Sequence, residues 1–249
     1  MLPELTRHDL AAALAEVAAK LLDAAEISAP PVDAFVVAGA CGLAVLSDDQ
    51  QAGRARFVRL RRHAPDFGQG SIFLRPDPRP ERLQWAVAHE IGESRAAEVF
   101  RLLGARVGET PAGAREFVAN SLASHLLLPM EWFGADGALC RWDLLRLKRR
   151  YSTASHELIA RRMLDFEPPV IITVFDQARM TWRNWAHAGR TPRLAGEECR
   201  CWQQVHDTGR MHRREHQGLA IRAWAVHEPD WKREIMRTEL PDADFDDYG

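Results

Sequence analysis

The sequence predicts an α+β fold, with a mainly helical first part that carries a small sheet and a β-rich part after it. Apolar residues at helical spacing predict a helix over residues 8–26 with one buried face; they are Leu10, Leu14, Val17 and Leu21. Short strand-like segments separated by loops rich in Asp, Gly and Pro follow this helix and predict the small sheet. After Pro168 and Pro169 the segments become rich in Val, Ile and Trp, which indicates the β-rich part.

The longer helices are predicted from periodicity and from proline positions. Pro80 lies near the first turn of a helix expected over residues 81–103. A second helix, over residues 111–128, is expected to end at Pro129. Residues 141–164 predict one or two more helices. The shorter predicted elements are a helix over residues 32–40 and strands over residues 43–46, 56–60, 71–74, 170–175, 179–185, 201–205 and 219–226.

These patterns predict three divisions of the chain. We expect a first domain over residues 1–167, a β-rich module over residues 168–240 and an acidic tail over residues 241–249. The 249 residues suit one full domain or two small ones and suffice to bury a core.

Composition excludes several classes of protein. The formal net charge is −2, whereas dedicated DNA- or membrane-binding proteins are usually strongly basic, so neither nucleic acid nor membrane is expected as a partner. No apolar run approaches the roughly 18 residues that span a bilayer. The four cysteines are few and scattered, which favours a reducing, cytoplasmic setting. The sequence indicates no particular oligomeric state.

The segment AHEIGE at residues 88–93 carries the strongest chemical signal. On a helix His89 and Glu93 are four residues apart and share one face, so both can bind the same divalent metal ion. Glu90 lies about 100° around the helix from His89 and can reach a metal-bound water without being a ligand. This is the arrangement of the H-E-x-x-H metalloprotease helix, with Glu93 at the position of the second His.

A third ligand has to come from elsewhere in the chain. Glu116, near the start of the next predicted helix, is the candidate, and small alanines on its face favour close packing of the two helices. His125 is nine residues further on, about 180° around the helix, and is not expected to share the site. Gly92 within the first helix indicates either a close approach of another segment to the site or ordinary helix packing.

Two segments together resemble the ImmA/IrrE family of zinc-dependent endopeptidases: ERLQWAVAHEIGE at residues 81–93 and EFVANSLASHLLLPM at residues 116–130. That family has an E-R-x-x-x-A-H-E-x-G-H helix followed by an E-x-x-A-N-x-x-A-x-x-L-L-x-P helix. Both His residues of its first motif and the Glu of its second bind zinc, and the Glu beside the first His is the general base. The resemblance implies a zincin-like first domain, metal ligands at His89 and Glu116, and Glu90 as the catalytic base.

Glu93 departs from the family pattern, in which this position is His. A carboxylate ligates zinc at similar distances, so we expect His89, Glu93 and Glu116 to hold one divalent ion, zinc in the first place, with manganese as the alternative. The extra anion should weaken the Lewis acidity of the ion relative to a set of two His and one Glu. The opposing interpretation is a metal-free site in which Glu93 pairs with Arg95 or another cation.

The function that the resemblance implies is a cytoplasmic, regulatory metallo-endopeptidase that cleaves a helix-turn-helix transcriptional repressor. Glu90 would take a proton from the attacking water and pass it to the leaving amine. The rival hypothesis is a zincin-like domain that has lost turnover through Glu93 and acts as a regulatory protein- or peptide-binding module. A second metal site is a weaker prediction, because C-x-C spacing is not that of a common zinc module; its candidate residues are Cys199, Cys201, His206, His212 and His216.

Overall fold

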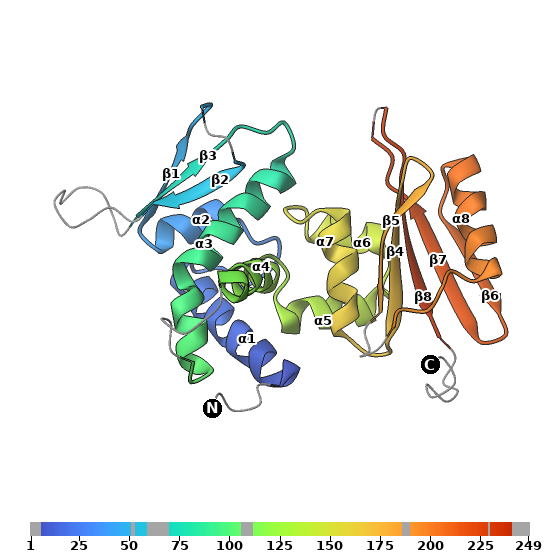
Figure 1. Cartoon of the computed structure of the whole chain (residues 1–249), viewed down its shortest axis with the longest axis horizontal. Coiled ribbons are helices and arrows are strands. Elements are labelled where there is room, and N and C mark those ends of the chain that lie inside the picture. Colours follow the sequence, from blue (N-terminus) through green and yellow to red (C-terminus); the bar gives the residue numbers. More distant parts are fainter. Residues whose placement is uncertain are drawn as a thin grey trace. The chain divides into compact units, whose positions relative to one another are not determined.

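The computed structural model describes residues 6–50, 53–58, 70–105, 112–185, 190–228 and 230–240. Helices dominate the first part of the chain and sheet dominates the last part, which confirms the predicted α+β class (Figure 1). The chain packs as two compact units, the first made of Met1–Asp136 and Arg149–Ser155, the second of Gly137–Lys148 and His156–Gly249. The predicted domain boundaries stay predictions, and the predicted acidic tail lies outside the described residues.

The first unit contains a small mixed sheet in the order β1-β3-β2. In the centre, β3 (Gly70–Leu74) pairs in parallel with β1 (Leu43–Ser47) and antiparallel with β2 (Ala55–Val58). Because β3 has a neighbour on both sides, it is the most buried of the three, and Ile72 at its middle is fully buried. The described part of the segment predicted as a strand over residues 56–60 forms β2, which is an edge strand.

Helices of the first unit pack around a helix pair, α3 (Pro80–Leu102) and α4 (Ala112–Leu127), that lies beside the small sheet (Figure 1). The predicted proline start of α3 is confirmed, because Pro80 occupies its first turn, where the missing N–H has no helical partner to lose. The other helices are α1 (Arg7–Ala24), α2 (Ala34–Ala40) and α5 (Met130–Leu139), whose last three residues belong to the second unit. The sequence patterns had not predicted α5, which begins directly after Pro129.

Helices α3 and α4 approach each other closely at Gly92. A Cβ added there would lie 2.5 Å from the carbonyl oxygen of Ala119 and 2.9 Å from its Cα. Real Cβ atoms do not approach backbone that closely, so only glycine permits this helix separation. Gly92 therefore packs directly against α4, the helix that also carries Glu116, and this contact positions one face of α3 against α4.

The second unit is built on an antiparallel sheet in the order β5-β4-β8-β7-β6. Helix α8 packs on one face of this sheet, against β6, β7 and β8, and α7 packs against β4 and β8 (Figure 1). The strands are β4 (Val170–Asp176), β5 (Arg179–Trp185), β6 (His212–His216), β7 (Leu219–Ala225) and β8 (Arg233–Glu239). The helices are α6 (Leu144–Arg150), whose last two residues belong to the first unit, α7 (His156–Arg162), the 3-10 helix η2 (Met163–Asp165) and α8 (Gly196–Thr208).

The strand predicted over residues 201–205 is wrong, because this segment lies within α8. Its buried residues are Glu198, Cys201 and Val205, at the i, i+3 and i+7 positions of a helical face. The Trp and Val of this segment had suggested a strand, but the buried side chains cover the sheet only when the backbone is helical.

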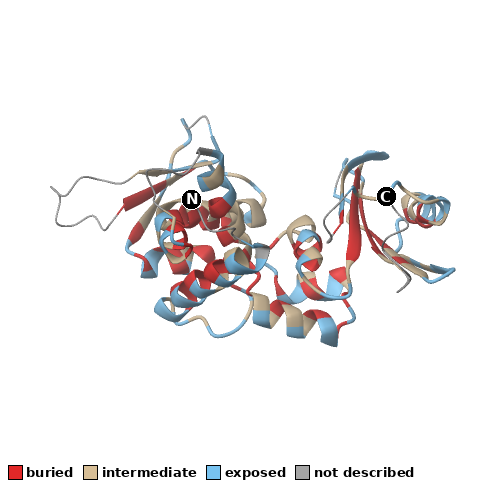
Figure 2. Cartoon of the chain, turned by 60° about the horizontal axis from the view of Figure 1, so that its bottom comes forward, coloured by how far each residue is buried: buried red, intermediate tan, exposed pale blue. Residues whose placement is uncertain are grey.

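Strand β8 lies at the centre of the sheet and is largely buried, although its sequence is rich in charge. Figure 2 shows buried residues along the inner part of this sheet. The fully buried carboxylate of Glu234 accepts hydrogen bonds from three side chains: the indole of Trp202 at 3.2 Å, His206 at 3.0 Å and His227 at 2.8 Å. Buried charges are tolerated when they are paired in this way. Neither β6 nor β8 was predicted, because their polar sequences gave no apolar alternation.

Candidate metal centre

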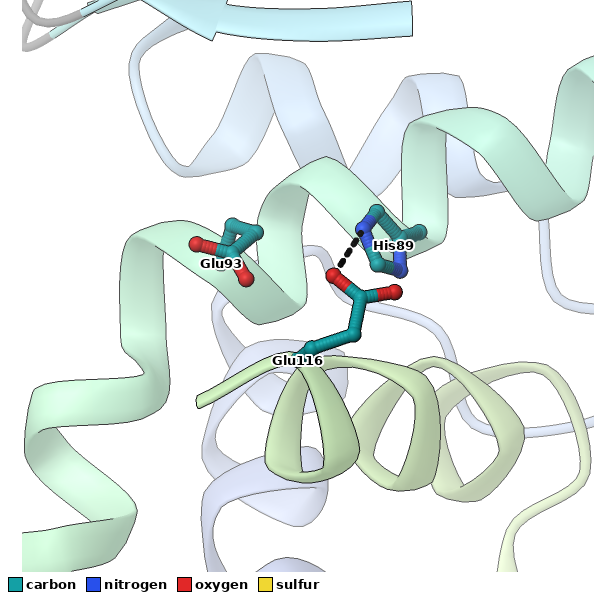
Figure 3. Close-up of side chains that lie close together, drawn as sticks. All are labelled: His89, Glu93 and Glu116. Carbon is teal, nitrogen blue, oxygen red and sulfur yellow. Dashed lines mark ion pairs between the residues drawn. The ribbon is translucent and has the colours of Figure 1, made fainter. Parts of the chain in front are cut away.

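Three side chains with metal-ligating atoms converge where α3 meets α4. His89 and Glu93 project from the same face of α3, and Glu116 approaches them from the first turns of α4 (Figure 3). One ligand atom from each lies within 4.8 Å of the others, and His89 Nε2 is 3.7 Å from Glu116 Oε2. This is the one such group of three His, Cys, Asp or Glu residues within the described ranges.

Asn120 connects two of these side chains. It lies one helical turn after Glu116 and donates from Nδ2 to Glu116 Oε1 at 2.9 Å. Its Oδ1 lies 3.1 Å from His89 Nδ1, so the His89 tautomer that donates from Nδ1 leaves Nε2 free as a ligand atom. A hydrogen bond of this kind orients a ligating imidazole and raises its basicity.

Glu93 is engaged by a cation from the facing helix. Arg115 donates from Nε to Glu93 Oε2 at 2.6 Å and from Nη2 to the backbone carbonyl of Glu93 at 3.1 Å. The Glu93 side chain is 21% exposed and that of Arg115 52% exposed, so water screens the pair in part. The pairing of Glu93 with a cation, which the sequence left open, therefore occurs, and the partner is Arg115.

Glu90 lies next to the group but points towards the sheet. Its Oε2 accepts a hydrogen bond from the backbone N–H of Phe57 in β2 at 2.7 Å, and the residue is only 7% exposed. Burial raises the pKa of the Glu90 carboxyl, and the nearby Glu93 and Glu116 act in the same direction, while His89 and the Phe57 N–H oppose them. A carboxyl whose pKa is raised is better suited to accept a proton and return it.

The donor set fits a divalent cation. Ligand atoms around four-coordinate zinc lie about 3.4 Å apart, given bonds of about 2.0–2.2 Å, and the separation of His89 from Glu116 is close to this. Two carboxylates and one imidazole are ligand types that zinc and manganese accept. The obstacle is Arg115, which competes with any ion for Glu93.

The remaining candidates do not join this group. His125 hydrogen-bonds the carbonyl of Ser121 on its own helix, and the suggested second site receives no support, since Cys199 is exposed and Cys201 buried on α8. Arg115, Asn120 and the Phe57 N–H were given no role from sequence. Asn120 carried a usable signal, its i+4 spacing from Glu116, whereas the hydrogen bond from Phe57 depends on tertiary packing.

The fold and the site define an α+β protein in which a helix pair with a His-Glu-Glu group lies beside a small mixed sheet. The sequence profile described as the IrrE N-terminal-like domain of the M78 peptidases matches residues 38–164, about half of the chain. The chain belongs to this family, as the resemblance of its two helices implied.

The fold is also similar to that of a solved structure. A Mycobacterium tuberculosis transcriptional regulator superposes with a TM-score of 0.63 over 90% of this chain and 74% of its own length. The two sequences are 18% identical, so this likeness concerns the fold alone. No curated protein matches the chain.

Proposed function

We propose that this chain is a metal-dependent endopeptidase that cleaves a helix-turn-helix transcriptional repressor in the cytoplasm. The observation that carries the proposal is the convergence of His89, Glu93 and Glu116 from two helices, with the buried Glu90 beside them. Membership of the family supports a protease or regulator related to IrrE. The structural neighbour, a transcriptional regulator, is consistent with a role in transcription control. Among the described helices, none is long and apolar enough to cross a membrane.

In this proposal each side chain has one task. His89, Glu93 and Glu116 hold the ion, and Asn120 orients His89 and Glu116. When bound, zinc or manganese supplies a Lewis acid that makes water more acidic and polarises a carbonyl. The Phe57 N–H holds Glu90 Oε2, so Oε1 takes the proton of the attacking water and delivers it to the leaving amine.

The second candidate function is a regulatory binding module without turnover. The ion pair between Arg115 and Glu93 favours it, because a guanidinium at 2.6 Å already neutralises the carboxylate that replaces the family's His. In this alternative the helix pair and its surroundings still bind a protein, but the site holds no ion.

Arg115→Gln is expected to tighten the binding of zinc about two- to fivefold. The substitution frees Glu93 and removes a positive charge beside the ion, and a half-exposed ion pair contributes about 0.2–1 kcal/mol. Competition against a chromogenic chelator measures the dissociation constant. Arg101→Gln, an exposed change in the last turn of α3, is the matched control. Unchanged affinity in the Arg115 variant would mean that Glu93 is not a ligand.

Glu93→His separates the two functions. If the chain is an enzyme, the wild type cleaves a candidate repressor when loaded with zinc or manganese. The variant, with a stronger Lewis acid at the site, then cleaves it several times faster with zinc. Cleavage is followed by gel electrophoresis and mass spectrometry, with Glu98→His on the same helix as control. A wild type that is inert beside an active Glu93→His variant identifies a binding module and contradicts the proposal.

A further inference from the structure

A second concave site lies in the first unit, formed by α1, the turn that follows it, the end of α4 and the start of α5. It is a cavity of about 470 Å³, within the range of pockets that hold small ligands. Its apolar lining includes Leu22, Ile27, Pro129, Met130 and Trp132. None of the residues proposed for the metal centre lines it.

The sequence of α1 creates the space for this cavity. Ala15, Ala18, Ala19 and Leu22 line it at the i, i+3, i+4 and i+7 positions, so one helical face presents mostly methyl groups. Longer side chains at the three alanines would fill the volume. The residue next to this face, Ala12, is exposed and does not line the cavity.

The turn after α1 holds an acidic residue in a conformation that glycine adopts more readily. The N–H of Ile27 bonds to the carbonyl of Leu22, and the N–H of Glu26 to that of Asp23, which is the Schellman pattern of a helix end. Glu26 occupies its left-handed position with φ 54°. Glycine is the usual residue there, because it has no Cβ to strain the backbone. The sequence thus keeps a carboxylate at the cavity where glycine would fit the turn better.

The lining of the cavity carries three carboxylates and no lysine or arginine. The carboxylates belong to Asp23, Glu26 and Glu131, and the other titratable side chain of the lining is His125, whose Nδ1 lies 2.9 Å from the carbonyl oxygen of Ser121. Within the described part of the chain none of these three carboxylates forms an ion pair. Glu131 lies in the first turn of α5, whose dipole favours a negative charge there. Asp23 and Glu26, at the opposite helix end of α1, gain no such support, so their charge is available to a ligand.

We propose that this cavity binds a small organic cation: an ammonium or guanidinium group on an apolar, aromatic-sized body. The body would occupy the alanine face and the wall formed by Leu22, Ile27 and Trp132, while the cationic group meets Asp23 and Glu26. The indole of Trp132 offers an additional attractive face to a cation. The site is independent of the proposed hydrolytic function.

Three probes of the same shape test the charge preference by isothermal titration calorimetry: naphthylethylamine, naphthylethanol and naphthylacetate. Metal-free full-length protein in the presence of chelator is used, so the outcome does not depend on the metal centre. We expect the amine to bind about tenfold more tightly than the alcohol, and the carboxylate not to bind. About 0.5 M sodium chloride should weaken the binding of the amine severalfold, because the carboxylates are solvent-exposed and salt screens their charge.

Two variants locate the binding site, each with a matched control. Glu26→Gly should weaken the binding of the amine about threefold or more, while the thermal unfolding midpoint of the variant protein stays the same or rises. General damage to the fold does not produce this combination. Ala19→Trp fills the cavity and should abolish binding. Glu16→Gln and Ala12→Trp, elsewhere on α1, should leave the affinity unchanged.

Three results would overturn the proposal. The first is equal binding of the amine, the alcohol and the carboxylate, and the second is the failure of the amine to bind the wild type. The third is an amine affinity in Ala19→Trp equal to that of the wild type. The expected result is a cation preference that Glu26→Gly reduces, and amine binding that Ala19→Trp abolishes.

Discussion

Gly92→Ala is expected to lower the free energy of unfolding by about 2 kcal/mol and the affinity for a divalent ion by at least about tenfold. The added Cβ would lie 2.5 Å from Ala119 O and 3.1 Å from Ala119 C. These are backbone atoms that cannot rotate away, so α3 and α4 must move apart. The better helix propensity of alanine, about 1 kcal/mol, offsets only part of the cost. The proposed ligands lie on both sides of this contact, so their spacing changes with it.

Urea denaturation and a zinc titration on the same protein measure both effects. Gly113→Ala on α4 is the control, since a Cβ there meets nothing within 4 Å; it should leave zinc affinity unchanged and stability equal or slightly higher. A Gly92→Ala variant that is destabilised yet binds zinc like the wild type would show that the helix contact does not set the ligand geometry.

Glu90→Gln is expected to reduce repressor cleavage by about 10²–10⁴-fold, mainly through kcat. Gln retains an oxygen that can accept the Phe57 N–H, so the local structure should persist, but it cannot take a proton from water. Because Glu90 is assigned no role as a ligand, zinc affinity should change little. Separating kcat from KM, and measuring bound zinc beside the rate, distinguishes loss of a base from loss of the ion.

The control for this experiment is Glu98→Gln, two turns further along α3, where the carboxylate lies 3.7 Å from Lys20. Its cleavage rate should equal that of the wild type. Wild-type rates in a Glu90→Gln variant with full metal content would show that another group is the base.

Much of the fold was predictable because local signals agreed with the final packing. The face of α1 is an example: Leu14, Val17 and Leu21 are buried as their spacing predicted, while Leu10 near the start of the helix is only partly buried. Proline and periodicity likewise predicted α3 and α4 to within about two residues. Sequence reasoning failed where burial depends on partners far along the chain. Strand β8 can bury Glu234 because side chains from α8 and the side chain of His227 form hydrogen bonds with its carboxylate. No local sequence pattern predicts these bonds.

At the candidate metal centre, too, local sequence predicted some features, while others depend on tertiary packing. Helical spacing placed His89 and Glu93 on one face, and the close pairing of α3 with α4 brings Glu116 to them. The ion pair from Arg115 was not predictable in the same way. Arg115 precedes Glu116 in sequence, but its reach to Glu93 follows from the separation that Gly92 permits between the helices.

Metal content tests the central claim most directly. Full-length protein is loaded separately with zinc and manganese, dialysed and measured by elemental analysis, with His89→Ala treated in parallel. The proposal predicts about one ion per wild-type chain for at least one metal, and loss of that ion in the His89→Ala variant. Wild-type protein that retains no divalent ion, or equal retention by wild type and variant, would contradict a metal centre at His89, Glu93 and Glu116.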